Sequence, residues 1–260
     1  MKPSESSGSS FIGNQALVGR MAMSLVPKNL VLPVFRGPLK GKKWVVRSGV
    51  FAYYLGTYEY GNQRLLHESV SPGGTVYDIG AHVGFYTLVA SSIVGGRGRV
   101  VAFEPLPRNL KFLRKHIELN GVANVQVIDK AVADANGKVL FSLGEGSSMG
   151  HMSDKGEIEV DVVNLDSLIE ERVIAPPDFV KIDVEGAEFL VLTGAKRMLD
   201  EYYPDILLST HSLEVRDNCL SLLRSCGYDT SSLSGNAENV GRDYFARKKG
   251  KGLVFCGTPN

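Results

Sequence analysis

The sequence TVYDIGAHVGFYT, residues 75–87, decides the fold. Its first part, Thr75–Ile79, is β-branched and apolar and follows the turn-forming sequence SPGG, which is typical of a buried strand. Gly80 and Gly84 then bracket a tight turn, and the apolar residues from Phe85 to Val94 predict a helix. A strand, a glycine turn and a helix in this order predict an α/β protein that presents backbone N–H groups at a helix N-terminus to a ligand.

A second strand follows at the distance that a nucleotide-binding fold requires. Arg99–Phe103 is apolar and ends at Glu104, which lies 20 residues after Gly84. A doubly wound fold places there the carboxylate that accepts hydrogen bonds from a ribose. The two glycines alone would also suit simple packing, but Glu104 in this register favours a nucleoside ligand.

The glycine spacing indicates which nucleoside. A dinucleotide site needs a middle glycine so that the backbone can approach a pyrophosphate, and the turn GAHVG has none. Asp78 stands at the end of the strand before this turn. A strand-end acid, this turn and Glu104 together suit a nucleoside that carries a small zwitterion, as S-adenosylmethionine does, and they disfavour an NAD-linked reductase.

Length and composition limit the alternatives. A chain of 260 residues with 43% hydrophobic and 22% charged residues is ordinary for one sizeable α/β domain. Its formal net charge of +1 gives no electrostatic reason to expect a nucleic acid or an anionic membrane as partner. The three cysteines, Cys219, Cys226 and Cys256, are too few and too late in the chain for a disulfide framework, so a reducing, cytoplasmic location is expected.

The N-terminal part is expected to be an extension of the main domain. Residues 16–35 are fairly apolar, but charged and proline residues such as Arg20 and Pro27 interrupt them, so no membrane span is expected. The features of a signal peptide are missing as well. A helix that caps the domain, with a homodimer contact, is the expected use. The chain is therefore divided into an extension, residues 1–70, and a cofactor-binding domain, residues 71–260.

An aromatic turn precedes the first core strand. Trp44–Val46 and Phe51–Leu55 are predicted to pair as a hairpin outside the main sheet. The next residues, GTYEYG, form a polar-aromatic turn before a helix at Gln63–Val70. Because this turn lies just ahead of the core, it is placed to fold over the nucleoside pocket. Tyr58 and Glu59 either contact the polar end of the cofactor there or anchor the turn to the core.

Strands and helices alternate through the rest of the chain, which predicts a mostly parallel, doubly wound sheet. A Gly/Ser/Met-rich loop, residues 144–156, is a candidate substrate gate, in which Ser147 or His151 either touches a ligand or is solvated. The basic run at residues 247–249 is expected on a solvated loop. The predicted elements are helix Pro107–Asn120; strands Asn124–Ile128, Val139–Leu143 and Ile158–Val163; helix Leu165–Arg172; strand Phe179–Asp183; a helix from Val184 to Asp200; strand Ile206–Thr210; helix Leu213–Cys226; and strands Tyr228–Leu233 and Leu253–Cys256.

Polar side chains stand at the carboxyl ends of the predicted strands, where ligands bind in such a sheet. Asp129 is expected beside the adenine, with Ala131 against its face. Asp183 and Glu185 either orient a methyl acceptor or cap the following helix. His211 is either a catalytic base or a rim histidine. Two carboxylates without a His or Cys ligand pattern make a weak metal site, so no metal is predicted.

Four motifs in this order resemble the FkbM-type S-adenosylmethionine-dependent methyltransferases: TVYDIGAHVGFY, VVAFEPLPRNL, FVKIDVEGAE and PDILLSTH. The resemblance extends over about residues 37–213. It implies a class I methyltransferase fold, with a doubly wound, seven-stranded sheet whose final strand is antiparallel. The sequence departs from the family pattern at His82, where Asn is common, and at Ser209, where many relatives carry an acid.

The resemblance also implies roles for site residues. Glu104 would hold the ribose, and Asp183 and Glu185 would face the methyl acceptor. The predicted catalytic residues are His211, Asp183 and Glu185. The predicted cofactor-binding residues are Tyr58, Glu59, Asp78, Gly80, Ala81, His82, Gly84, Phe85, Tyr86, Glu104, Pro105, Asn109, Asp129, Ala131 and Asp183.

Known members of this family mostly methylate oxygen on natural products, sugars or carboxylic acids, and some methylate nitrogen on peptides. The sequence therefore predicts S-adenosylmethionine-dependent O-methylation of a small molecule, with N-methylation of a peptide as the alternative. A non-catalytic nucleoside-binding module is a further alternative from a different class.

Overall fold

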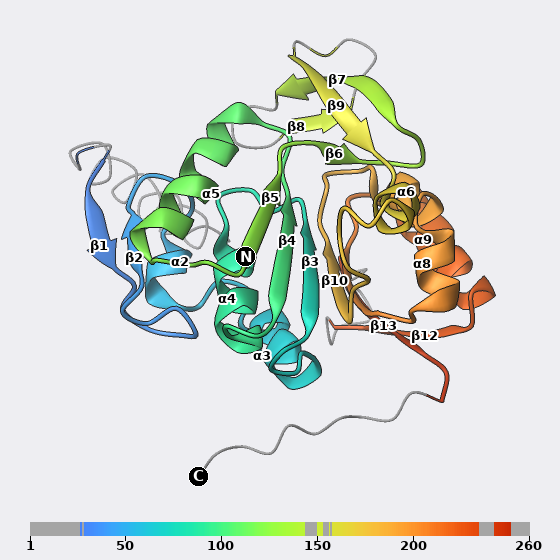
Figure 1. Cartoon of the computed structure of the whole chain (residues 1–260), viewed down its shortest axis with the longest axis horizontal. Coiled ribbons are helices and arrows are strands. Elements are labelled where there is room, and N and C mark those ends of the chain that lie inside the picture. The colour runs from blue at the N-terminus through green and yellow to red at the C-terminus, as the bar shows by residue number, and fades with distance from the viewer. Residues whose placement is uncertain are drawn as a thin grey trace, which may run out of the picture.

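The computed structural model describes residues 27, 29–143, 150–152, 156, 158–233 and 242–250. Its main sheet has seven strands in the order β12-β13-β11-β10-β3-β4-β5 (Figure 1). These strands are β3 (Thr75–Ile79), β4 (Arg99–Phe103), β5 (Val125–Ile128), β10 (Phe179–Ile182), β11 (Asp205–Ser209), β12 (Tyr228–Ser232) and β13 (Asp243–Lys248).

The pairing of these strands confirms the predicted doubly wound sheet. All neighbours from β5 to β11 are parallel, and β13 lies antiparallel between β11 and β12. The chain builds β3, β4 and β5 toward one edge and then β10 and β11 toward the other. The strand order therefore reverses between β3 and β10, which is the place where an open α/β sheet forms a ligand crevice.

Helices cover both faces of the sheet, so the central strands are apolar on both sides. Successive residues of β3 alternate between the two faces: Val76 packs with the helices on one side, and Tyr77 packs with those on the other. Figure 1 shows α4 and α5 on one side of the strands and α6, α8 and α9 on the other. The first side is formed by α3 (Tyr60–Ser69), α4 (Phe85–Val94) and α5 (Pro107–Leu119), and the second by α6 (Leu165–Glu170), α7 (Glu188–Thr193), α8 (Lys196–Glu201) and α9 (Leu213–Ser225).

The N-terminal part packs into the same core as α3 and α4. A short hairpin of β1 (Val31–Pro33) and β2 (Lys43–Val45) precedes α2 (Ala52–Leu55). The predicted pairing of Phe51–Leu55 with the Trp44 strand is therefore wrong. Residues 52–55 are helical, which brings Tyr53 and Tyr54 into the core, whereas the partner of β2 comes from earlier in the chain. Of residues 16–35, those before 27 lie outside the described part, as does the predicted capping helix with its dimer contact.

A small second sheet lies at the top of Figure 1, beyond one end of the main sheet. Its strand order is β6-β9-β7-β8. Because β6 follows β5 after two residues, this sheet adjoins the carboxyl ends of the main strands. Ser147 and the side chain of His151 lie outside the described part. The strands are β6 (Ala131–Val132), β7 (Gly137–Leu143), β8 (Gly150–Met152) and β9 (Ile158–Val163).

The single helix predicted from Val184 to Asp200 is wrong. Glu185 and Gly186 have positive φ, 55° and 103°, so the helical conformation begins only at α7. The helix also breaks before α8, at Gly194. A Cβ on Gly194 would lie 2.2 Å from the carbonyl oxygen of Ala133, so this break is where the chain passes close to the small sheet.

The last strand of the main sheet is also placed differently from the prediction. It is β13, whereas the predicted strand Leu253–Cys256 lies outside the described part. Tyr244 and Ala246 of β13 are buried in the core. The basic run starts on this strand and not on a loop, because Arg247 forms an ion pair with buried Asp205.

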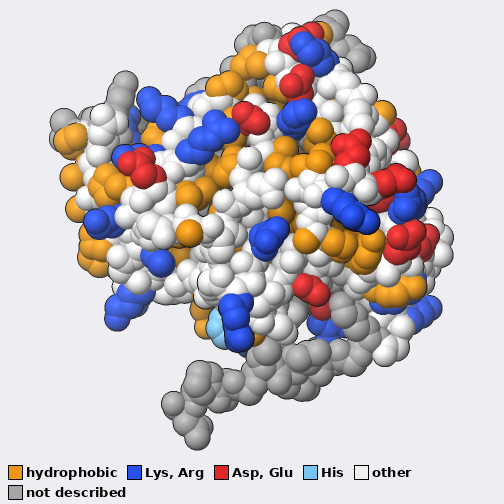
Figure 2. Space-filling view, in the orientation of Figure 1, with side chains coloured by type: hydrophobic (Ala, Val, Ile, Leu, Met, Phe, Trp, Pro, Cys, Tyr) orange, Lys and Arg blue, Asp and Glu red, His pale blue; other side chains and the backbone are white. Residues whose placement is uncertain are grey.

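Charges are mixed on the face that Figure 2 shows. There the Lys and Arg side chains are interspersed with Asp and Glu side chains over the coloured surface. This agrees with a formal net charge of only +1. Across the described residues, no helix is both long enough and apolar enough to cross a membrane.

Candidate active site

A cavity opens at the reversal of the strand order. Its volume is about 270 Å³, which is near the lower end of ligand pockets, roughly 300 Å³. Residues at the carboxyl ends of β3, β4 and β10 and at the start of the small sheet line it. Most of the predicted site residues line it: Tyr58, Asp78, Gly80, Ala81, His82, Phe85, Tyr86, Glu104, Pro105, Asn109, Ala131, Asp183 and Glu185.

Gly80 allows two strand ends to approach each other at this cavity. Its φ of 82° lies in the left-handed region, which favours glycine. A Cβ at this position would lie 1.9 Å from the backbone oxygen of Asp183. The end of β3 can therefore reach the end of β10 only because residue 80 has no side chain, and this contact sets Asp78 and Asp183 beside one cavity.

Four backbone N–H groups of the glycine turn, which precede the first residue of α4, Phe85, are used within the protein. Gly80 and Ala81 both donate to the Phe103 carbonyl, at 3.0 and 2.9 Å. The N–H of His82 donates to Glu104 at 2.8 Å, and that of Gly84 donates to Ala81. These four groups do not bind a ligand while they bond in this way. The turn therefore shapes the cavity and leaves ligand recognition to side chains.

Asp78 and Lys181 form a buried pair on one face of the sheet. They are register partners across β3 and β10, so both side chains project to the same side. Lys181 Nζ lies 3.6 Å from Asp78 Oδ1 and 3.3 Å from Asp183 Oδ2. Burial lowers the pKa of Lys181, but the two carboxylates outweigh it and hold this pKa above its usual range. The ammonium therefore stays charged and fixes both acids at the cavity.

One oxygen of Asp78 remains available to a ligand. Oδ2 accepts a hydrogen bond from the Thr87 hydroxyl at 2.6 Å. Oδ1 is buried and accepts none from the described residues. A buried carboxylate oxygen without a hydrogen bond is costly. Since Asp78 lines the cavity, a cationic donor such as an amino group suits this oxygen.

Glu104 joins the end of β4 to the glycine turn. It is only 4% exposed, and it accepts hydrogen bonds from the N–H groups of His82 and Leu106 and from the Asn109 amide. Burial raises the pKa of Glu104 to about 7, although these three bonds oppose the shift. Oε1 accepts two of these bonds and Oε2 only one, so Oε2 has capacity for a further donor such as a ribose hydroxyl.

His82 occupies a position that suits Asn or Gly. Its φ is 51°, in the left-handed region where Asn and Gly are favoured. Asn and His are both enriched among the non-glycine residues that adopt this conformation, so the turn accommodates His82 in place of Asn. Burial lowers the pKa of His82 to about 4, so the imidazole is neutral. Its Nε2 is buried, lacks a hydrogen-bond partner among the described residues and belongs to a cavity-lining side chain.

Aromatic rings form one wall of the cavity. The ring of Tyr58 lies 4.7 Å from that of Tyr53 and 5.5 Å from that of Phe85. The Tyr86 hydroxyl donates to Glu59 at 2.7 Å. Glu59 does not line the cavity itself. The turn before the core therefore both anchors to the aromatic cluster and contributes Tyr58 to the wall.

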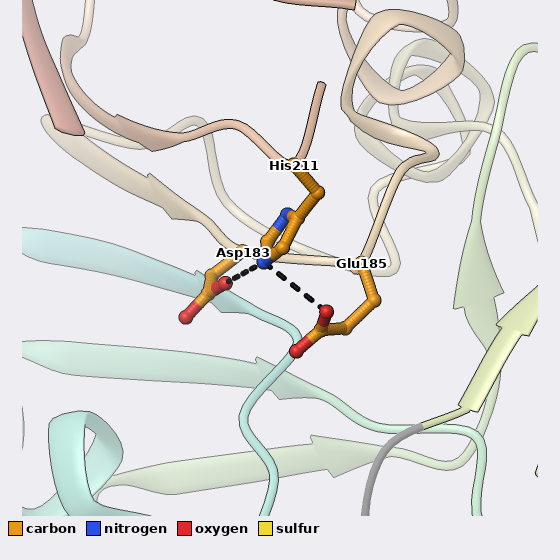
Figure 3. Close-up of side chains that lie close together, drawn as sticks. All are labelled: Asp183, Glu185 and His211. Atoms are coloured by element: carbon orange, nitrogen blue, oxygen red, sulfur yellow. Dashed lines mark ion pairs between the residues drawn. The ribbon is translucent and has the colours of Figure 1, made fainter. Parts of the chain in front are cut away.

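A second set of polar groups includes two more lining residues of the cavity, Asp183 and Glu185. Asp183, Glu185 and His211, called here the acid–histidine cluster, come from the ends of β10 and β11 (Figure 3). His211 Nε2 lies 3.6 Å from Asp183 Oδ1 and 3.2 Å from Glu185 Oε2. Asp183 and Glu185 line the cavity, whereas His211 is not a lining residue but directs its Nε2 at both acids (Figure 3). Glu185 does not cap α7, whose N-cap is Ala187 without a side-chain bond.

A fully buried carboxylate orients the histidine of this cluster. Glu188 Oε1 accepts from His211 Nδ1 at 2.6 Å, so Nε2 points toward Asp183 and Glu185. Burial lowers the pKa of His211, but Glu188 and the two cluster acids raise it above its usual value. Burial raises the pKa of Asp183, whereas Lys181 and His211 pull it below its usual range. The cluster therefore carries negative charge and readily holds one proton.

Three predicted site residues lie away from the cavity. Asp129 is exposed at the surface, where it pairs with Arg114 at 3.2 Å. Ala131 lines the cavity, but Asp129 does not. Gly84 ends the turn at the N-cap of α4, outside the lining. Glu59 accepts hydrogen bonds from Tyr86 and Asn62 and is not a lining residue. Ser209, the position at which many relatives carry an acid, donates a hydrogen bond to Asp243 of β13 at 2.7 Å. An acid from another strand therefore lies next to it.

Sequence reasoning missed three polar residues of the lining: Tyr53, Lys130 and Lys181. Lys181 could have been predicted from the sequence. It lies inside the apolar run FVKI, and a lysine in a strand that is buried on both faces requires a partner of opposite charge. Glu188 was missed too. It carries no local signal, since its partner His211 is distant in sequence.

The strand order, with its antiparallel β13, and a cavity at the reversal point define a class I methyltransferase fold. The cofactor of such enzymes, S-adenosylmethionine, fits the residues present. Asp78 offers a buried oxygen that has Lys181 as an ion partner but accepts no hydrogen bond, Glu104 Oε2 has capacity for a hydroxyl donor, and Gly80 provides a contact that a side chain would block.

Comparison with known proteins agrees with this fold. The family model of the methyltransferase FkbM domain matches residues 78–230, more than half of the chain. The chain therefore belongs to the FkbM methyltransferase family, as its motifs predicted. It also resembles methyltransferase FkbM from Methylobacillus flagellatus KT, a solved structure, with a TM-score of 0.50 and 20% identity, covering 75% of this chain and 52% of the other.

Two curated relatives are similar over part of their length. The hexuronic acid methyltransferase AglP of Haloferax volcanii is 26% identical over 138 residues, which is 52% of this chain and 56% of that protein. The 31-O-demethyl-FK506 methyltransferase FkbM of Streptomyces tacrolimicus is 29% identical over 195 residues, 60% of this chain and 73% of that protein. The chain thus matches little more than half the length of the first relative.

Proposed function

We propose that this protein transfers a methyl group from S-adenosylmethionine to a hydroxyl oxygen of a small molecule, such as a sugar or a sugar acid. One observation carries the proposal: a single cavity is lined by groups that suit the cofactor, Asp78 and Glu104, and also by Asp183 and Glu185 of the acid–histidine cluster. The two relatives, which act on a hexuronic acid and on 31-O-demethyl-FK506, support a small acceptor.

Each group of the cavity has a role in this reaction. Asp78 Oδ1 binds the amino group of the cofactor's methionine end, and Glu104 accepts hydrogen bonds from its ribose. S-adenosylmethionine supplies a methyl group on a positively charged sulfur, which a well-placed oxygen can attack. The aromatic wall around Tyr58 excludes water, and the protein contributes mainly position and a dry site.

The acid–histidine cluster handles the proton of the acceptor. A hydroxyl is a weak nucleophile until its proton is removed, and neutral His211 with Nε2 as acceptor removes it. Glu188 holds the ring in this tautomer through Nδ1, and Asp183 and Glu185 stabilise the imidazolium that results. A base at this position suits a hydroxyl acceptor, whose oxygen becomes a strong nucleophile only when its proton is removed.

Calorimetry with S-adenosylhomocysteine, the product form of the cofactor, tests the cofactor end of this proposal. Asp78→Asn is expected to weaken binding about 10- to 100-fold, because a hydrogen bond to a charged group contributes roughly 1.5–3 kcal/mol. Asp129→Asn makes the same chemical change at an exposed position and is the matched control. Equal affinities of the two variants would contradict the proposal.

Labelled S-adenosylmethionine offered with a panel of sugars and uronic acids tests the acceptor. Transfer of label to a hydroxyl oxygen is expected. A second panel of peptides is offered in parallel, and label that appears only on peptide nitrogen would instead favour the alternative.

A further inference from the structure

We propose that Asp183, Glu185 and His211 bind a divalent cation, which holds the methyl acceptor through two of its oxygen atoms. This inference deepens the proposed function and rests on it for the role of the cation. From the sequence, Asp183 and Glu185 alone made only a weak metal site, because His211 lies 26 residues after Glu185 and joins them only in the fold.

The geometry of the donor atoms suits a cation. One oxygen of each acid and Nε2 of His211 lie within 4.8 Å of one another. The two distances from Nε2 are 3.6 and 3.2 Å. Two ligands of one metal ion, each about 2.1 Å from it, lie roughly 3.0–3.4 Å apart in octahedral or tetrahedral coordination. The side chains therefore need only small shifts to bind an ion between them.

The surroundings orient each ligand. Lys181 holds Asp183 through Oδ2, which leaves Oδ1 directed at the cluster. Glu188 holds His211 through Nδ1, which leaves Nε2 as the ligand atom. A carboxylate that fixes the far nitrogen of a histidine is the usual second partner of a metal-binding imidazole.

An independent observation, the buried charge behind the cluster, also favours a cation. Glu188 is 0% exposed, and its Oε2 lacks a hydrogen-bond partner among the described residues. Lys181 is already shared between Asp78 and Asp183, and Arg242 acts on Asp183 only as a minor influence. A cation on Nε2 would polarise the imidazole and so offset the charge of buried Glu188 through its Nδ1–H.

The site leaves room for a substrate. The side chains of Asp183 and Glu185 are 25% and 37% exposed, and both line the cavity, so an ion there keeps coordination positions for other oxygens. Two carboxylates and one imidazole suit Mn²⁺ or Mg²⁺. The acceptor class that fits has two neighbouring oxygens, as in a vicinal diol or a hydroxy acid.

The cation changes how the acceptor is activated. Coordination would lower the pKa of the acceptor hydroxyl, whose proton would pass to water at the exposed side of Glu185, and His211 would serve as a ligand. The acceptor oxygen forms a bond to the methyl carbon, and the sulfur keeps the electron pair of the bond that breaks.

Titration of Mn²⁺ into the purified, EDTA-stripped full chain, followed by electron paramagnetic resonance, tests the site without cofactor or acceptor. One bound Mn²⁺ per chain is expected. Glu185→Gln, a half-exposed position, is expected to weaken binding about 10-fold or more, and Glu188→Gln roughly 10- to 100-fold through misorientation of His211. Glu159→Gln, on an exposed pair with Lys138, is the control that leaves binding unchanged.

The outcomes separate this inference from the proposed function. No bound Mn²⁺ at millimolar concentration, or binding that Glu185→Gln leaves unaltered, overturns the cation site. If methyl transfer then persists in EDTA, the proposed function stands with His211 as the base. Failure to bind S-adenosylhomocysteine overturns the proposed function whatever the Mn²⁺ titration gives.

Discussion

At the scale of single residues, the cavity depends on charged groups that are held in place by other charged groups. Lys181 is buried yet charged because Asp78 and Asp183 flank it. The imidazole of His211 is set by Glu188. Such groups are costly to bury alone and acceptable when paired, which is why they are found together at a site and not scattered through the core.

Glu104 gives a testable pH dependence of stability. Its pKa is about 7 in the folded protein, against 4.5 for an ordinary glutamate. Below pH 4.5 the group is protonated in both the folded and the unfolded chain. Between these values the unfolded chain releases the proton while the folded chain keeps it, so rising pH favours unfolding. Above pH 7 the loss is complete, at roughly 3 kcal/mol from about 1.4 kcal/mol per pKa unit.

Glu104→Gln isolates this effect, because glutamine does not titrate and its altered hydrogen bonds contribute equally at every pH. We expect the free energy of unfolding of the ligand-free wild type, relative to this variant, to fall by roughly 3 kcal/mol between pH 4 and pH 8. Urea unfolding of both proteins at several pH values measures this difference in the free energy of unfolding. A difference that stays constant with pH would show that Glu104 is not buried as described.

At the scale of elements, β2 is tied to the glycine turn through one histidine. His116 of α5 binds the Val83 carbonyl through Nδ1 at 2.7 Å and accepts from the Val45 N–H through Nε2 at 3.1 Å. Burial lowers the pKa of His116 to about 4, so the neutral ring donates at one nitrogen and accepts at the other. Trp44 stacks on this ring at 3.8 Å and is fully buried.

The N-terminal elements are therefore expected to contribute to the stability of the whole domain. Trp44→Ala should lower the free energy of unfolding by about 3–5 kcal/mol, as for other buried aromatic residues. Phe35→Ala removes an aromatic ring that is 63% exposed and should change it by less than about 0.5 kcal/mol. Chemical denaturation of both variants checks this. Similar values for the two would mean that β2 is not part of the core.

The outcomes at these two scales show what a sequence can predict. Asp78, Glu104, Asp183 and His211 were predicted because each follows an apolar strand, and parallel strands end at one edge. Asp129 follows the same rule but turns outward to Arg114, since β5 is the edge strand and its end is open to water.

Other features depend on contacts that no local pattern encodes. The pairing of Glu188 with His211 and the bridge that His116 makes between Val83 and Val45 join distant segments. The strand at Asp243–Lys248 was missed because its alternating pattern is interrupted by charges, one of which is paired with buried Asp205.

At the scale of the whole molecule, the order of the strands in the main sheet determines where the cavity lies. The reversal between β3 and β10 brings the ends of β3, β4 and β10 around a single space. Asp78 and Glu104 lie toward the side of β3 and β4, and the acid–histidine cluster lies toward β10 and β11. A methyl donor on one side and an acceptor on the other would therefore meet within one cavity.

A crystal structure of the protein with S-adenosylhomocysteine tests this arrangement most directly. The account predicts that the ribose hydroxyls bind Glu104, that the amino group binds Asp78 Oδ1, and that the sulfur faces Asp183. A nucleoside bound outside this cavity, or bound within it with Glu104 turned away from the ribose, would contradict the account.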